Sequence, residues 1–237
     1  MWKRIGDLLY PETCVVCHRI PDGADDEKMC SECRKKIPFI EEPRCKRCSK
    51  PLADMESELC GDCEGHTFYV ERGAALYPYN EWMQKAVRNI KYQGELAGCS
   101  YFGKQMAERY RSWLEQISPE VIVPVPIHEK KMRFRGFNQA ALLAKEVGER
   151  LEIPVEENYL IRTENTSPQK GLGRTERMRN LQSGFQVHDE VSGRYHRILL
   201  VDDIYTTGAT LEACARALKK AGTERIYFLC LCIGRGD

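Results

Sequence analysis

The sequence has little net charge, no long apolar run and no apolar segment near its start. Its formal net charge is +1, which predicts no general attraction to polyanions, so any nucleic-acid binding would depend on local clusters of charge. No stretch approaches the ~20 consecutive apolar residues that a membrane-spanning helix needs. Residues 1–10 lack the sustained apolar run of a signal peptide. We therefore expect a cytoplasmic protein without membrane insertion.

The remaining composition is that of a globular protein with an unusual number of cysteines. Apolar residues make up 42% and charged residues 30% of the 237 residues, enough for one domain of ordinary size and a small module. Twelve cysteines in a chain without an export signal indicate thiolates bound to metal rather than disulfides.

Eight of these cysteines form four CxxC pairs at regular intervals in the first part of the chain. The pairs are Cys14/Cys17, Cys30/Cys33, Cys45/Cys48 and Cys60/Cys63. Two such pairs complete the closed tetrahedral shell of structural zinc. The segment has few large apolar residues, and metal binding worth ~10–16 kcal/mol would replace the missing core. We predict a module over residues 1–67 that holds two structural Zn²⁺ ions.

The pairing of these cysteines has more than one solution. Sequential pairing gives two consecutive zinc ribbons, which we favour, whereas a cross-brace would join the first pair to the third. An iron–sulfur site or a redox dithiol is a further alternative, although four regular pairs suit closed zinc sites better. His18 and His66 lie beside the pairs, but both shells are complete without them, so we expect exposed histidines.

From about Phe68 the pattern changes to alternating apolar strands and amphipathic helices. Strands are predicted over 73–77, 121–126, 185–187, 197–201 and 225–232, and helices after Asn80 and over 99–116, 138–150 and 209–221. This alternation predicts an α/β domain over residues 68–237, with a largely parallel sheet flanked by helices. The other four cysteines lie at apolar positions and are expected in its core: Cys99, Cys214, Cys230 and Cys232.

The segment after the most hydrophobic strand carries a candidate ligand site. Asp202 and Asp203 end that strand, and ligands of parallel sheets bind at the carboxyl ends of strands. Paired carboxylates can accept hydrogen bonds from ribose hydroxyls, with nearby Mg²⁺ offsetting their charge. Small and hydroxyl residues follow where a helix N-terminus can bind a phosphate: Thr206, Thr207, Gly208, Ala209 and Thr210. The alternative is an acidic turn whose threonines only cap the helix.

This strand and loop resemble the phosphoribosyl-diphosphate (PRPP) signature of type I phosphoribosyltransferases. With the cysteine pairs and three further motifs, the chain resembles the ComF (ComFC) family of late competence proteins. Those motifs are Lys91–Gly94 (KYQG), Val123–Pro126 (VPVP) and Arg135–Gln139 (RGFNQ). The resemblance implies that Asp202 and Asp203 hold the ribose hydroxyls and that residues 206–210 hold the 5′-phosphate. It also implies a role in natural transformation, with imported single-stranded DNA and a ComFA-type helicase as partners.

Two further segments are assigned to the PRPP site through this resemblance. Residues 128–139 read as a basic loop, and the corresponding loop binds pyrophosphate. The pyrophosphate candidates are Arg133, Arg135 and Gln139 in this loop and Pro126 before it, whereas Lys130 and Lys131 could equally be solvated surface. Residues 162–174 read as a flexible loop, either a lid over PRPP or a surface insertion. Family positions in and after it are Arg162, Gln169, Arg177 and Asn180, and we count Arg162 and Arg177 with the two aspartates as catalytic candidates.

Three functions remain open at this point. An active phosphoribosyltransferase of nucleotide metabolism or salvage would displace pyrophosphate from C1 of PRPP with a nitrogen nucleophile, but no motif identifies the acceptor. A non-catalytic PRPP sensor would bind single-stranded DNA or protein, and Phe134 and Phe137 beside basic residues could stack bases. A redox or metal-storage protein would explain the cysteines and nothing after residue 68.

Overall fold

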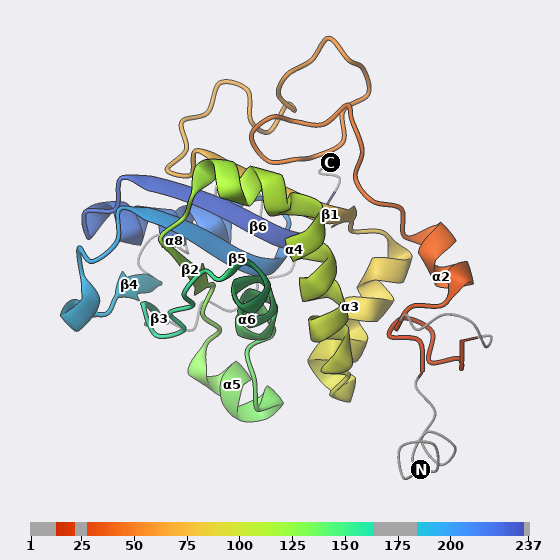
Figure 1. Cartoon of the computed structure of the whole chain (residues 1–237). Helices are drawn as coiled ribbons and strands as arrows, with labels where there is room; N and C mark the ends of the chain where they lie inside the picture. Colours follow the sequence, from red (N-terminus) through yellow and green to blue (C-terminus); the bar gives the residue numbers. More distant parts are fainter. Residues whose placement is uncertain (1–12, 22–27, 164–183, 235–237) are drawn as a thin grey trace.

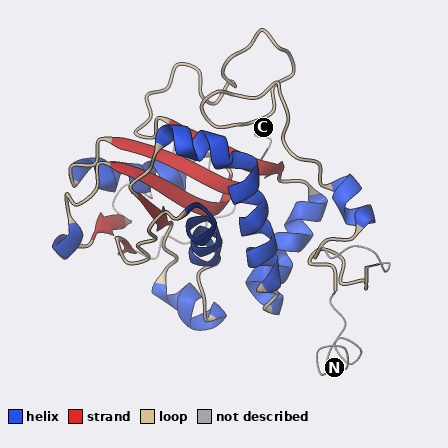
Figure 2. Ribbon diagram, viewed as in Figure 1, coloured by secondary structure: helices blue, strands red, loops and turns tan. Residues whose placement is uncertain are grey.

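A four-stranded sheet forms the centre of the molecule in a computed structural model that describes residues 13–21, 28–163 and 184–234. Its strand order is β1-β6-β5-β2, and every neighbouring pair is parallel. The strands are β1 (Arg72–Pro78), β2 (Val121–Pro124), β5 (Arg197–Tyr205) and β6 (Arg225–Ile233). The predicted parallel α/β sheet is confirmed, and the carboxyl ends of its strands lie on the same side of the sheet (Figures 1 and 2).

Helices cover both faces of this sheet. One face packs against α3 (Glu81–Gln93), α4 (Ala97–Ile117) and α6 (Gln139–Leu151), and the other packs against α8 (Ala209–Lys220). Alternate residues of β5 serve the two cores, because successive side chains of a strand point to opposite faces. Leu199 and Val201 lie in the first core, and Ile198 and Leu200 lie in the second.

A short antiparallel pair lies beside the main sheet. It joins β3 (Leu160–Arg162) to β4 (Phe185–Val187), and the 3-10 helix η1 (Asp189–Val191) follows. The β4 strand was predicted from the apolar–polar–apolar order of its residues, whereas β3 has the sequence LIR, which does not alternate, and was not predicted. The pair brings Arg162 to the side of the sheet that α8 covers.

The predicted basic loop contains a helix, α5 (Glu129–Arg135), which corrects the sequence interpretation. The His128 side chain accepts a hydrogen bond from the Lys130 N–H at 3.1 Å and caps its start. Gly136 ends the helix in the left-handed region at φ 81°, which glycine adopts without a steric penalty. None of the helix residues is buried, so α5 has no apolar periodicity from which it could have been predicted.

The cysteine-rich module, which includes α2 (Ser31–Lys36), packs against the α/β domain. The Asn89 side chain donates to the carbonyls of Val15 and Val16 at 3.2 and 3.0 Å and so ties the first ribbon to α3. The second ribbon lies along β1, where the Gly73 N–H donates to the Arg47 carbonyl at 2.8 Å. The module therefore covers the open edge of the sheet, which would otherwise be free to pair with another chain.

Among the described residues, no helix has both the length and the apolar character required to cross a membrane.

Candidate functional site

The two predicted aspartates lie at the carboxyl end of β5, at the centre of the sheet. The strand continues to Tyr205, so both aspartates lie within its last four residues rather than in the loop that follows. The Asp203 N–H donates to Asp202 Oδ1 at 2.8 Å. As adjacent residues of a strand, the two side chains leave the sheet on opposite faces.

Asp203 is held by two residues from distant parts of the chain. It forms an ion pair with Lys91 at the end of α3, and both side chains are largely buried, at 17% and 8% exposed. The Gln139 side-chain amide at the start of α6 donates to Asp203 Oδ1 at 3.2 Å. Three sequence motifs, KYQG, RGFNQ and the aspartate loop, therefore meet at one carboxylate.

The two carboxyl groups differ strongly in their ionisation. Burial alone would raise the pKa of Asp203, but the Lys91 ammonium and the Gln139 amide outweigh it and hold that pKa below its ordinary value. Burial raises the pKa of Asp202 well above its ordinary value, and the negative charge of Asp203 adds to this effect. The pair thus carries one stabilised carboxylate and one that gains from a new hydrogen-bond donor or cation.

Cations surround this pair of carboxyl groups. Arg135 donates to Gln139 Oε1 at 3.0 Å and to the Tyr92 hydroxyl at 3.4 Å. Burial lowers the pKa of Lys131, and the charges of Arg162, Arg135 and Lys91 lower it further. An anionic ligand stabilises a cluster of cations that lie close enough to repel one another. The site therefore suits a ligand with several negative charges.

The loop after Asp203 leads into the N-terminus of α8. Gly208 precedes the helix at φ 77°, and a Cβ there would lie 2.4 Å from the Tyr205 hydroxyl, so this position requires glycine. Glycine supplies no capping side chain. The Thr207 hydroxyl accepts a long hydrogen bond from the Ala209 N–H, at 3.5 Å. The first N–H groups of α8 are then available to an anion. Thr206 is exposed beside them, and Thr210 is half-buried.

The other predicted site residues fall into three groups. Half-buried Pro126 follows the carboxyl end of β2, on the side of the sheet where the aspartates lie. Arg162, at the end of β3, lies with its guanidinium over the Phe185 ring at 5.2 Å, and the charge of Asp202 acts on it. Arg133 points away, exposed, in an ion pair with Glu129. Gln169, Arg177 and Asn180 lie outside the described residues, as does the predicted lid beyond Thr163.

Three residues of this site were not assigned a role from the sequence. Lys91 and Tyr92 belong to a quoted motif, but nothing local indicates that the end of α3 reaches the aspartates. Lys131 could not be separated from Lys130 until α5 was known to be a helix. Helical geometry places Lys131 and Arg135 one turn apart on the same face, which is the face toward Asp203.

The eight leading cysteines form two clusters of four. Cys14, Cys17, Cys30 and Cys33 form one, and Cys45, Cys48, Cys60 and Cys63 form the other, with the ligand atoms of each within 4.8 Å of one another. This confirms sequential pairing. Burial raises the pKa of Cys14, but N–H donors from Cys17, Cys30 and Val16 outweigh it and bring that pKa to about 7. Thiols arranged in this way fit the four-sulfur shell of structural zinc. His18 and His66 are exposed and outside both clusters, as expected.

Comparison with known proteins places this architecture in a family. The double zinc ribbon domain model matches residues 5–64, and the phosphoribosyl transferase domain model matches residues 135–237. Competence protein F of Haemophilus influenzae is 31% identical over 206 residues, covering 84% of this chain and 87% of that protein. Competence protein ComFC of Bacillus subtilis is 32% identical over 206 residues, covering 83% and 80%.

The chain belongs to the ComF/ComFC family. DNA utilization protein YhgH of Salmonella typhimurium is similar along almost the whole chain, at 28% identity over 229 residues, covering 95% of this chain and 98% of that protein. In this member of the ComF/ComFC family, the phosphoribosyl transferase match contains Gln139, the two aspartates and the loop of residues 206–210. Lys91 and Tyr92 lie before it, so the site draws on residues beyond the matched segment.

Proposed function

We propose that this chain is a cytoplasmic PRPP-binding protein of DNA uptake that acts with imported single-stranded DNA during natural transformation. The single observation that carries the PRPP assignment is the convergence at Asp203. A buried carboxylate is fixed by Lys91 and Gln139 between an uncapped helix N-terminus and a cluster of cations. A plain acidic turn would need neither neighbour.

PRPP has three polar parts, and the site offers a matching group for each. The 5′-phosphate would bind the backbone N–H groups of residues 206–210 at the start of α8. The ribose hydroxyls would donate to Asp202 and Asp203, which are acceptors when ionised. The diphosphate would bind Lys131, Arg135 and Arg162, the cations near the carboxyl ends of β2 and β3.

Mg²⁺ would accompany the diphosphate in this proposal. The oxygen atoms of diphosphate and carboxylate are the hard ligands that this ion prefers. The raised pKa of Asp202 supports it, because a nearby cation favours the ionised carboxylate over the protonated form. Asp202 therefore gains most from the ion.

The role in DNA uptake follows from the family, whose members include proteins named for competence and for DNA utilization. Single-stranded DNA and a ComFA-type helicase are the partners we propose on that basis. The zinc ribbons support a binding role more than a catalytic one, since closed four-cysteine shells leave no open metal position.

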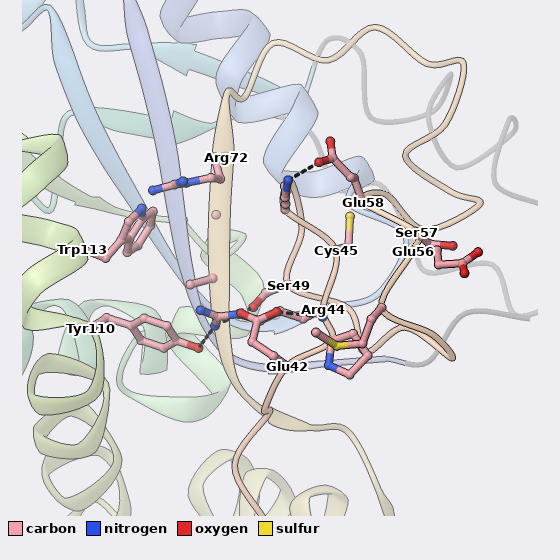
Figure 3. A pocket seen from close by; sticks show the side chains of 15 residues that line it. Glu42, Arg44, Cys45, Ser49, Glu56, Ser57, Glu58, Arg72, Tyr110 and Trp113 are labelled. Carbon is pink, nitrogen blue, oxygen red and sulfur yellow. Dashed lines mark hydrogen bonds and ion pairs between the residues drawn. The ribbon is translucent and has the colours of Figure 1, made fainter.

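Active phosphoribosyl transfer is the alternative function. We rank it second because the cavity that could hold an acceptor lies far from the aspartates. A cavity of about 470 Å³ lies between the second ribbon, α4 and the first half of β1 (Figure 3). Its lining includes Arg72, Tyr110 and Trp113. β6 lies between β1 and β5. In the sheet register, Asp202 of β5 pairs with Cys230 of β6, which pairs with Ala75 of β1. A base bound in the cavity would be too far from the aspartates to attack C1 of PRPP.

PRPP binding is tested by thermal unfolding of the zinc-loaded protein with Mg²⁺ and PRPP. Ligand at 100 times its Kd should stabilise the folded state by about 2.7 kcal/mol. D202N/D203N should abolish the shift, and K104M, a change on the exposed face of α4, should keep it. An unchanged melting temperature of the intact protein with PRPP would refute the site. Pyrophosphate release measured with bases and DNA then separates transfer from binding.

A further inference from the structure

Helix α5 has two faces with different surroundings. Lys131 and Arg135, four residues apart, face Asp203 and belong to the proposed diphosphate site. Lys130, Arg133 and Phe134 have i, i+3, i+4 spacing and therefore share another face. All three are exposed, and Figure 1 shows α5 projecting from the body of the domain. We call these three residues the outer face of α5.

The ring of Phe134 is the main feature of this outer face. At 78% exposed it is the most exposed of the large apolar side chains in the described part of the chain. A single exposed apolar residue is ordinary on a protein surface. This one, however, lies between cations on a helix that buries none of its residues, so the ring contributes nothing to the core and is free to contact a partner.

A second aromatic ring lies on the flank of α5. Tyr92, at the end of α3, is 61% exposed, and the Arg135 guanidinium stacks over its ring at 5.2 Å. Arg135 also donates to Gln139, which binds Asp203. Contacts therefore link Tyr92 and Arg135 to Asp203 through Gln139, and Arg135 is on the same short helix that carries the outer face.

The charge of α5 indicates the chemistry of its partner. The helix and its flanks carry four cations and one acid, Glu129. That acid forms an exposed i, i+4 ion pair with Arg133, and pairs of this kind contribute little, so a phosphate can replace the carboxylate. The surface is thus locally basic on a protein whose formal net charge is only +1.

We propose that the outer face of α5 binds single-stranded nucleic acid, with one base stacked on Phe134 and the flanking phosphates on Lys130 and Arg133. This rests on the proposed function for the role of the strand, but the surface is assigned from its own residues. Exposed rings among cations are the groups that bind single strands, because every unpaired base offers a flat face. A duplex hides those faces, and an acidic peptide would gain nothing from the ring.

Fluorescence anisotropy of a labelled oligothymidylate on the full-length, zinc-loaded protein tests this surface. F134A should weaken binding by about tenfold or more, the loss of one stacked base, whereas F134Y should keep it. K130Q/R133Q should reduce the slope of log K against log salt by about 1.4, at ~0.7 for each phosphate contact to a single strand. M55A is the matched control, because Met55 on the second ribbon is 77% exposed and should not matter.

Three results would overturn the assignment: no binding of the strand, equal binding by F134A, or full competition by duplex DNA or polyglutamate. The PRPP-dependent thermal shift is measured on the same variants. F134A should retain that shift, and D202N/D203N should lose it while still binding the strand. A strand signal that depends on Phe134 without any PRPP shift would refute the proposed ligand and leave this surface standing. A PRPP-dependent shift without strand binding that depends on Phe134 would refute the proposed surface and leave the PRPP site standing.

Discussion

The carboxylate of Glu212 accepts a hydrogen bond from the backbone N–H of Tyr69 at 2.8 Å. It also accepts one from the Val70 N–H at 3.4 Å, and the residue is only 7% exposed. Glu212 lies in the first turn of α8, directly after the loop that we propose binds the 5′-phosphate. Tyr69 and Val70 follow the second zinc ribbon. One buried side chain thus joins the metal-binding module to the start of α8.

We expect E212A to lower both stability and affinity for PRPP. Two backbone N–H groups would lose their acceptor, at a cost of about 1–3 kcal/mol, and the first turn of α8 would lose its anchor. E212Q keeps one acceptor oxygen and should fall between E212A and the native protein. Thermal unfolding and calorimetric titration with PRPP measure the two effects. Native behaviour of E212A in both assays would show that the contact positions nothing.

Lys91 and Asp203 should prove energetically coupled. K91M leaves a buried carboxylate without its cation, which typically costs about 3–5 kcal/mol. D203N removes the charge that needs the cation, so K91M/D203N should be less unstable than the sum of the two single changes. Chemical denaturation of the four proteins measures this coupling.

An exposed pair provides the comparison for that cycle. Lys104 and Glu108 lie one turn apart on α4, with side chains 48% and 51% exposed. K104M should change stability by no more than about 1 kcal/mol. Additive effects in the Lys91–Asp203 cycle would mean that the buried ion pair does not form in solution.

The parts of this protein that could be predicted are those with a local signal. Strands such as Val121–Pro124 consist of adjacent apolar residues, and the CxxC pairs carry their chemistry within four positions. The position of Lys91 has no local signal, because the fold of the whole domain brings the end of α3 to β5. Helix α5 was missed for a related reason. It buries none of its residues and contacts the domain through the cations Lys131 and Arg135, so no apolar pattern marks it.

Asp202 should limit the stability of the protein without ligand. Its folded-state pKa is raised above the ordinary value of about 3.9, so the folded state keeps the proton longer than the unfolded state. Stability therefore falls as pH rises from about 4 toward the raised pKa and is level above it. D202N cannot ionise, and we expect it to melt about 2–4 °C higher at neutral pH, the effect of ~1 kcal/mol in a chain of this size.

Asp54 supplies a control of opposite sign. It accepts the backbone N–H groups of Glu56 and Ser57, and these hydrogen bonds lower its pKa. Its contribution to stability is present above the unfolded pKa and is lost as pH falls. D54N should therefore lose stability at neutral pH and match the native protein in acid. Melting curves across this pH range that show no gain for D202N would contradict the raised pKa that burial and the charge of Asp203 give Asp202.

The second zinc ribbon should protect the sheet edge as well as hold metal. C45S/C48S removes half of one four-sulfur cluster, so metal analysis should find about one zinc per chain fewer than in the native protein, whose two closed shells predict two. The ribbon supplies the Arg47 carbonyl to the Gly73 N–H of β1. Loss of its fold would expose an unpaired edge strand, and we expect the variant to self-associate. H66A, a change at an exposed residue outside both clusters, should retain both zinc ions and stay unassociated in light scattering. A C45S/C48S protein that lost its zinc but did not associate would show that other residues cover β1.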